Sequence, residues 1–265
     1  MPAPSADDFV ALARSSPWRW STLRFTEGRV RPDARAGLRA WLRRPDALRV
    51  ETIGGALVQV VRERRPQVGV LSISGGRSEH VPWPGDLGAP EPTVRPDGLV
   101  AVRPSTRELS YDAPMYQDYF WVAMLDPVEL AEGLDHDTGE SAGPPLLVDD
   151  LAEVDHGGRP AWEAVVRPTG VYEPRCACCP LLRTREIDIL EYGGPMLDEY
   201  PEAFRVRLDV GTGVCVLTKE IGGLTSGAGH EVRIEAVDEP MDDELFRDPR
   251  RLPRESGWSQ YPGPT

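Results

Sequence analysis

Three cysteines lie within four residues, in the sequence Cys176-Ala177-Cys178-Cys179. Thiolates bind zinc and other soft metals, although zinc sites usually present cysteines in a C-x₂-C spacing. Cys176 and Cys179 have the C-x-x-C spacing of redox thiols, and Arg175 would favour a thiolate beside it. Free cysteine is also among the most buried residue types. The sequence therefore leaves three interpretations open: a metal site with Cys176, Cys178 and Cys179 as ligands, a redox or covalent site, and a structural turn.

A metal bound by these three thiolates needs a fourth ligand, for which the sequence offers Cys215, His156 and His230. The segment 135–140 begins like a calcium-binding loop, but its glycine and the residue at position 12 do not fit that template, so we expect a solvated acidic loop. We expect no cofactor, with zinc or another soft metal at the cysteines as the alternative.

Other catalytic signatures are absent from the sequence. There is no G-x-S-x-G nucleophile elbow and no G-x-x-x-x-G-K-[ST] phosphate loop. The glycines of 222–229 lie between predicted strands and indicate a hairpin turn. These absences favour a protein that is not an enzyme, and the cysteine cluster carries the competing prediction of a metal-thiolate or redox enzyme.

Aromatic residues supply a second kind of candidate site. Trp41, Tyr119, Phe120 and Trp162 fall on predicted strands or on a predicted central helix. An amphipathic helix against a curved sheet can enclose an apolar cavity, and these four side chains are our candidates for its lining. An ordinary hydrophobic core is the alternative, because large aromatic residues dominate cores.

The elements that must position these residues follow from periodicity. Residues 4–15 predict a helix capped by Ser5, and 115–133 predict a longer helix that restarts at Asp126-Pro127. Alternating apolar residues predict short antiparallel strands before and after that long helix. The predicted strands fall within 18–61, 68–73, 99–103, 146–154, 160–168, 204–209, 214–216 and 232–236.

This order of elements resembles a known family. The segment 119–127 follows a long β-meander, and the strand 204–209 leads through Thr212-Gly213 into another strand. The layout resembles the LolA and LppX lipoprotein-carrier superfamily, which includes the RseB-type regulators. The resemblance implies an α+β fold, a strongly curved antiparallel sheet that forms an unclosed half-barrel, with helices covering its concave face. It also implies a cavity for a hydrophobic small molecule or a lipid. We expect one domain over 1–246 and a loosely ordered tail, rich in Pro, Arg and Gly, over 247–265.

Charge and composition limit the classes of binding partner that we expect for this protein. The chain has 265 residues, a net charge of −13 and a single lysine. Residues 1–107 carry a net +6, whereas 108–163 carry a net −13. This distribution favours no nucleic-acid partner and leaves a protein partner of the acidic middle region as an alternative function. No apolar run is long enough to span a membrane, and 1–16 lack the apolar core of a signal peptide. We therefore expect a cytoplasmic protein.

Overall fold

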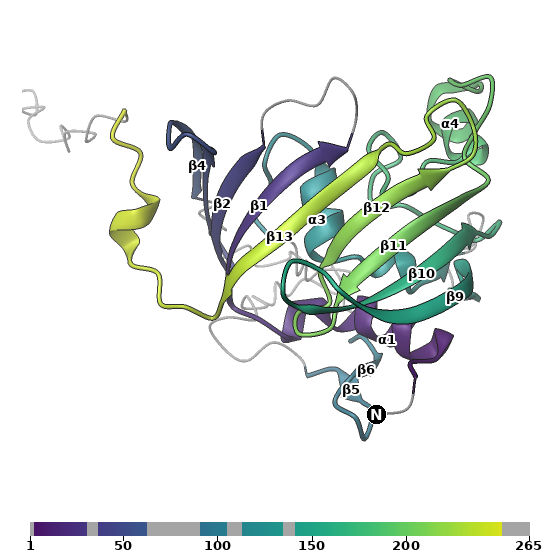
Figure 1. The fold of residues 1–265 in the computed structure, drawn as a ribbon, viewed down its shortest axis with the longest axis horizontal. Coiled ribbons are helices and arrows are strands. Elements are labelled where there is room, and N and C mark those ends of the chain that lie inside the picture. The colour runs from purple at the N-terminus through teal and green to yellow at the C-terminus, as the bar shows by residue number, and fades with distance from the viewer. Residues whose placement is uncertain (1–2, 31–36, 63–90, 105–112, 135–140, 251–265) are drawn as a thin grey trace, which may run out of the picture.

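A computed structural model describes residues 3–30, 37–62, 91–104, 113–134 and 141–250. Its main element is a nine-stranded antiparallel sheet in the order β4-β3-β2-β1-β13-β12-β11-β10-β9 (Figure 1). The strands are β1 (Thr22–Val30), β2 (Leu38–Arg43), β3 (Ala47–Thr52), β4 (Leu57–Arg62), β9 (Leu146–Asp155), β10 (Pro160–Pro168), β11 (Ala203–Asp209), β12 (Cys215–Ile221) and β13 (Gly229–Val237).

The strands of this sheet that come first and last along the chain, β1 and β13, are neighbours in its centre. β1 pairs with β13 from Leu23 opposite Val237 to Val30 opposite Gly229. This pairing joins the N-terminal meander β1–β4 to the C-terminal meander β9–β13, so the two halves share one sheet.

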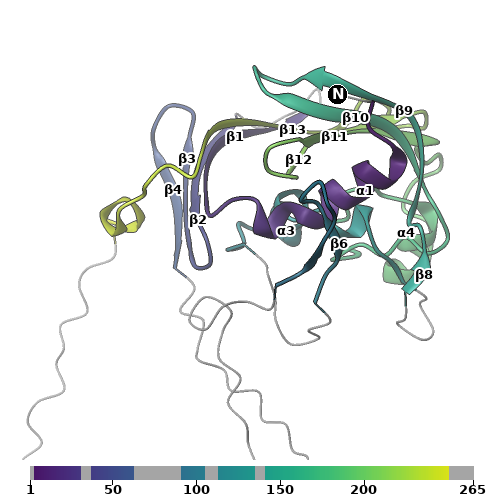
Figure 2. The ribbon, with the colours of Figure 1, turned by 90° about the horizontal axis from the view of Figure 1, so that it is seen from below.

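The sheet is strongly curved and remains open, with β4 and β9 at its two edges. Viewed from below, it arches over α1 (Ala6–Ser15) and α3 (Tyr119–Leu125), which lie on its concave side (Figure 2). The fold is therefore α+β, an unclosed half-barrel with helices on the concave face, as the sequence predicted.

The smaller elements lie around this frame. They are the α-helix α4 (Arg185–Tyr192), the 3₁₀ helices η1 (Ser16–Trp18), η2 (Val128–Leu130) and η3 (Asp243–Phe246), and the strands β5 (Thr93–Val94), β6 (Val100–Val102), β7 (Gly133–Leu134) and β8 (Ser141–Gly143).

The strand pattern explains which face is buried. In β11, Phe204, Val206 and Leu208 are buried in the main core, while Arg205 and Arg207 point to the other face. There both guanidinium groups form ion pairs with Glu163 of the neighbouring strand β10. Alternation along the strand thus separates the core from a charged outer surface.

The opening helix α1 closes the core from below. Ser5 and Asp8 form a capping box at its start, as the sequence indicated for the cap. Phe9 and Leu12 are fully buried in the main core. The apolar face of α1 therefore packs into the concave side of the sheet.

The predicted helix over 115–133 is wrong in extent. The structure has a seven-residue α3 followed by the short η2, and Asp126 does not cap a second helix. Instead the Asp126 carboxylate is fully buried and accepts hydrogen bonds from the guanidinium of Arg103, with Arg175 in an ion pair at 3.4 Å. A buried carboxylate requires such partners, and that requirement outweighs local helix capping.

A further helix escaped the sequence-based prediction. The helix α4 begins after Thr184, whose hydroxyl accepts a hydrogen bond from the Ile187 N–H, and ends at Gly193 with a φ of 75°. Its exposed face carries the apolar residues Ile189 and Leu190. The spacing of apolar residues in this segment therefore does not match the side of the helix that is buried.

The segment after β13 crosses the outer face of the N-terminal meander. Phe246 of η3 packs with Ala47 and Val60 in a second, smaller apolar cluster. Of the expected tail, 251–265 lie outside the described residues, as do the expected strand 68–73 and the acidic loop 135–140.

Candidate functional site

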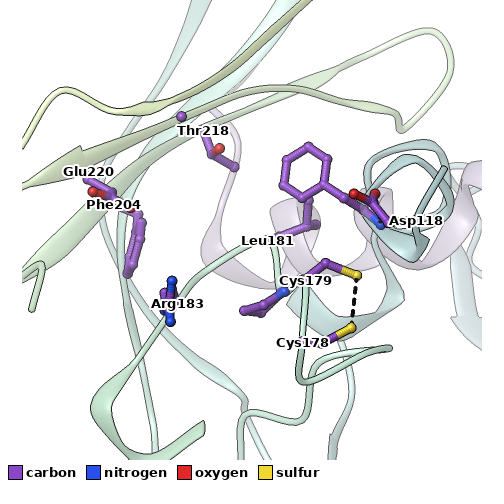
Figure 3. A pocket seen from close by; sticks show the side chains of 11 residues that line it. Asp118, Cys178, Cys179, Leu181, Arg183, Phe204, Thr218 and Glu220 are labelled. Carbon is purple, nitrogen blue, oxygen red and sulfur yellow. Dashed lines mark hydrogen bonds between the residues drawn. The ribbon is translucent and has the colours of Figure 1, made fainter. Parts of the chain in front are cut away.

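A pocket of about 230 Å³ lies between α3, the loop before α4 and strands β11 and β12 (Figure 3). Its walls come from β11, β12 and β13 of the C-terminal meander, from the start of α3 and from the loop before α4. The lining residues are Asp118, Phe120, Cys178, Cys179, Pro180, Leu181, Arg183, Phe204, Thr218, Glu220 and Gly229.

The pocket combines apolar and charged walls. Phe120, Leu181 and Phe204 are buried apolar side chains. The charged side chains come from Asp118, Arg183 and Glu220. The lining therefore offers a ligand both apolar contacts and charged hydrogen-bonding partners.

A hydrogen-bonded histidine supports the strand wall. The Nε2 of buried His230 lies 2.8 Å from the Cys215 carbonyl, which can only accept, so Nε2 donates there. Its Nδ1 lies 2.8 Å from the hydroxyl of Thr218, a pocket residue. The ring of Phe120 meets His230 edge to face, with centroids 5.0 Å apart. These contacts fix the position of Phe120 against the sheet.

Arg183 is held in place at the opposite wall. Its Nε donates to both carboxylate oxygens of Asp188 in α4, at 2.9 and 3.0 Å. Asp188 is buried and also accepts a hydrogen bond from the hydroxyl of Tyr200 at 2.6 Å. The helix α4, which the sequence did not predict, therefore positions a charged pocket residue.

The three clustered cysteines lie close together, and two of them, Cys178 and Cys179, line the pocket. The Sγ atoms of Cys176 and Cys178 are 2.7 Å apart, and those of Cys178 and Cys179 are 3.7 Å apart. All three sulfur atoms lie within 4.8 Å of one another. Cys178 is exposed and the other two are half-buried, which argues against a turn of buried, inert cysteines.

A single buried carboxylate organises this loop, which we call the thiol loop (residues 172–182). Glu129 of η2 accepts hydrogen bonds from the Tyr172 hydroxyl, the Arg175 N–H and the Leu181 N–H. The Tyr172 oxygen also accepts from the Leu182 N–H at 3.2 Å. Burial raises the pKa of Glu129, and the three donated hydrogen bonds oppose that rise. Both ends of the thiol loop are thus tied to one side chain.

The thiols influence each other's protonation. Burial opposes ionisation of Cys176, but hydrogen bonds from Cys178 and Cys179 outweigh it and lower the pKa of Cys176. The bond that Cys178 gives to Cys176 raises the pKa of Cys178. Burial, together with the two neighbouring sulfurs, raises the pKa of Cys179.

The four aromatic candidates do not converge. Phe120 lines the pocket, whereas its neighbour Tyr119 is 41% exposed. Trp162 packs against the main core from β10, and Trp41 packs with the smaller cluster on the outer face. Trp41 therefore lies on the opposite side of the sheet from the pocket, because its strand neighbours Ala40 and Leu42 face the core.

The candidate fourth metal ligands lie elsewhere. Cys215 is buried and donates to the Leu217 carbonyl, and His156 places Nε2 2.8 Å from the Val232 carbonyl. Together with His230, they are absent from the thiol group, which among the described residues contains cysteines alone.

Glu129, Asp126 and Arg183 were missed as site residues. The sequence places Asp126 directly before Pro127 and Glu129 two residues after it, in a predicted helix where acidic residues are ordinary surface positions. Their role depends on the approach of the thiol loop, more than forty residues downstream for Glu129. An acid surrounded by apolar residues in 119–131 was the one available signal.

Within the described residues, no helix has the length and apolar character needed to cross a membrane.

The comparisons with known proteins add little beyond layout. No protein-family model and no curated protein matches the chain. The crystal structure of MucB is similar to it with a TM-score of 0.41 and 15% identity, over 92% of this chain and 62% of that one. The chain thus spans less than two thirds of the MucB chain. This likeness is one of overall layout.

Proposed function

We propose that this protein is a non-enzymatic binding protein that holds a hydrophobic small molecule in the pocket beside α3. The observation that carries the proposal is the cavity of about 230 Å³ on the concave side of the sheet. Phe120 of α3 and Phe204 of β11 supply apolar surface from two different elements. Small ligands usually bind in concave cavities that combine apolar walls with a few polar groups, and this pocket has both kinds of wall.

The size of the pocket limits the occupant. Pockets for drug-sized ligands span roughly 300–1,000 Å³, so a cavity of about 230 Å³ suits a smaller molecule or the end of an acyl chain. The lipid alternative therefore requires the rest of the lipid to extend out of the mouth.

The charged residues give the ligand an orientation. Arg183 is fixed by Asp188, so its guanidinium offers a positioned donor without reorganisation. Phe120, Leu181 and Phe204 provide the apolar walls. We expect the ligand to place its apolar part against these walls and its polar group near Arg183.

Native mass spectrometry of the freshly purified protein tests this function. The expected result is a small organic molecule retained by the natural chain and lost after Phe120→Ala. Removing a buried phenyl ring costs about 2 kcal/mol of ligand contact, which weakens binding by roughly 10- to 100-fold. Titration with an apolar fluorescent probe gives the same comparison for added ligand.

Tyr119→Ala is the matched control, since Tyr119 is the preceding residue of α3 and is exposed outside the pocket lining. Urea unfolding shows whether each variant retains its fold. Equal probe affinity in a folded Phe120→Ala variant and the natural chain would contradict the proposal, as would absence of any retained or added ligand.

A further inference from the structure

The thiol loop brings three sulfur atoms together without the help of a disulfide. Cys176, Cys178 and Cys179 are all free thiols, and their Sγ atoms lie within 4.8 Å of one another. A disulfide would use two of the three sulfurs and give no role to the third, which lies in the same group. A metal ion uses all three.

The sulfur separations suit a metal of modest bond length. With Zn–S bonds of about 2.3 Å, a tetrahedral site places its sulfurs about 3.8 Å apart. Cys178 and Cys179 already have a separation of 3.7 Å. The Cys176 sulfur is 2.7 Å from that of Cys178, so it has to move away by about 1 Å to reach the tetrahedral separation.

The loop is prepared for this task before any ion binds. The N–H groups of Arg175 and Leu181, on either side of the cysteines, both bond to the carboxylate of Glu129. Within the loop the Cys179 N–H donates to the Cys176 carbonyl at 3.1 Å. A backbone held from both ends reduces the entropy lost when the three thiols close on an ion.

The donor set identifies the class of ion. Three thiolates favour soft, thiophilic ions over hard ions that prefer oxygen ligands. No further His, Cys, Asp or Glu in the part of the chain that the structure describes joins the group. Cys178 and Cys179 line the pocket, so a fourth coordination position would face it.

We propose that Cys176, Cys178 and Cys179 bind one thiophilic d¹⁰ metal ion, Zn²⁺ or Cu⁺, through three thiolates. Each thiol releases its proton to solvent as the ion binds, and no electron is transferred. With Zn²⁺, a water molecule or a ligand in the pocket completes the tetrahedron. With Cu⁺, three sulfurs suffice. The metal site adjoins the proposed ligand pocket through Cys178 and Cys179, but its ligands are the thiols and not Phe120, so separate variants test the two proposals.

Metal titration of the reduced full-length protein, purified without chelator, tests the proposal. Zn²⁺ is titrated against a chromophoric chelator, and Cu⁺ is titrated separately without oxygen. We expect one ion per chain and a loss of affinity of at least about 100-fold in Cys176→Ser, Cys178→Ser and Cys179→Ser. The two titrations decide which ion is preferred.

Two controls separate the site from the rest of the molecule. Cys215→Ala removes the one cysteine outside the loop and is expected to leave the stoichiometry and affinity unchanged. Circular dichroism verifies that the serine variants fold, which their exposed or half-buried positions favour.

Three results would overturn the proposal. These are failure of the folded, reduced protein to bind either ion, equal affinity in the serine variants, and loss of two thiols to a Cys176–Cys178 disulfide in protein that carries no metal. A ligand that binds normally alongside any of these results leaves the proposed function standing, so the two failures can be told apart.

Discussion

Glu129 is the residue on which the geometry of the thiol loop depends. One oxygen accepts from both Tyr172 and Leu181, and the other accepts from Arg175. All three partners are donors, so the site requires two acceptor oxygens on a short side chain. A carboxylate meets that requirement, and an amide does not.

Glu129→Gln is therefore expected to destabilise the protein by about 2–4 kcal/mol, because the amide NH₂ faces a donor and leaves it unsatisfied. The loss is read from urea unfolding. We also expect faster reaction of the Cys178 and Cys179 thiols with a thiol reagent, since the loop loses one of its anchors. Glu132→Gln is the control, because the side chain of that half-exposed acid makes an ion pair with Arg14 at 3.5 Å and accepts no backbone N–H from the thiol loop among the described residues. Equal losses in the two variants would show that Glu129 has no special role.

Some residues of the site can be predicted from the sequence and others cannot. Cys176, Cys178 and Cys179 are adjacent in sequence, so their meeting could be predicted from spacing alone. Phe120 could be predicted as a buried aromatic of a central helix. Glu129 could not, because its three partners come from a loop whose approach is a tertiary contact.

At the scale of elements, the turn between β11 and β12 touches α1 very closely. A Cβ atom at Gly213 would lie 2.6 Å from the Leu12 carbonyl oxygen, and Gly213 has a φ of +72°. Asp209 supports the same turn, accepting from the Thr212 N–H at 2.8 Å and pairing with Arg159. The turn is thus built for backbone contact between the helix and the sheet.

Gly213→Ala is expected to cost about 3 kcal/mol or more in free energy of unfolding, from left-handed strain and from displacement of α1. Gly158→Ala is a matched control, with a φ of +85° and no atom within 4 Å of the added Cβ. In that variant the free energy of unfolding should fall only by the cost of the left-handed strain, about 1–2 kcal/mol. Thermal unfolding compares the two, and a Gly213 variant no less stable than the Gly158 variant would disprove the close contact.

The segment that follows β13 acts as a strap across β2–β4. Phe246 is buried against Ala47 and Val60, and the guanidinium groups of Arg43 and Arg62 lie over its ring at 5.0 and 5.6 Å. The arginines also donate to carbonyl or carboxylate groups of the strap, including Met241 and Asp243. These hydrogen bonds attach the strap to the outer face of the N-terminal meander.

Phe246→Ala should loosen the outer strands before the rest of the molecule. We expect a loss of about 3–5 kcal/mol, concentrated in faster hydrogen exchange of the amides in β3 and β4. Glu244→Ala, a change at an exposed residue of the same turn, serves as control and should leave exchange unaltered. Uniform acceleration throughout the sheet would contradict a local role for the strap.

The elements differ in how well the sequence predicts them. Strands such as β11 and β13 alternate core and surface residues, and that period is visible without a structure. The length of α3 was overestimated because apolar residues continue beyond its end into η2. The α-helix ends there because Asp126 and Glu129 make contacts with distant segments, which the sequence pattern does not show. The helix α4 was missed because Ile189 and Leu190 are exposed.

At the scale of the whole molecule, charge is arranged by ion pairs between distant segments. Arg39 pairs with Glu235, and Arg43 pairs with Asp243, so acids from the C-terminal part neutralise arginines of the N-terminal meander. The described acids of the middle region include Asp149 and Asp155 on the edge strand β9. A charged edge strand resists pairing with other chains.

The pH dependence of stability follows from the buried acids. Burial alone would raise the pKa of Asp126, but Arg103 and Arg175 outweigh it and lower the pKa below its ordinary value of 3.8. The pKa values of half-buried Glu163 and exposed Asp238 are also lowered, by Arg207 and Arg205 for Glu163 and by hydrogen bonds from Ser21 and Thr22 for Asp238, although partial desolvation opposes both shifts. A lowered carboxyl pKa stabilises the fold above the unfolded value and loses that effect as pH falls through the folded value.

We therefore expect the melting temperature to fall as the pH drops below about 4. Asp126→Asn should lower stability at neutral pH by about 3–5 kcal/mol, because two guanidinium groups lose a buried partner. The same variant should show a shallower decline in acid. Calorimetry from pH 7 downwards measures both effects. Asp149→Asn is the control, since its pair with Arg167 is exposed, and an acid decline as steep in Asp126→Asn as in the natural chain would contradict this assignment.

The pairing of β1 with β13 has a consequence for synthesis of the chain. During translation β1 emerges early, but the strand that covers its free side is made about 200 residues later. Until then the apolar side chains of the first meander, such as Phe25 and Leu42, have neither the second meander nor the full core to cover them. Completion of the sheet therefore waits until β13 has been made, and until then the first meander is exposed to aggregation and to chaperones.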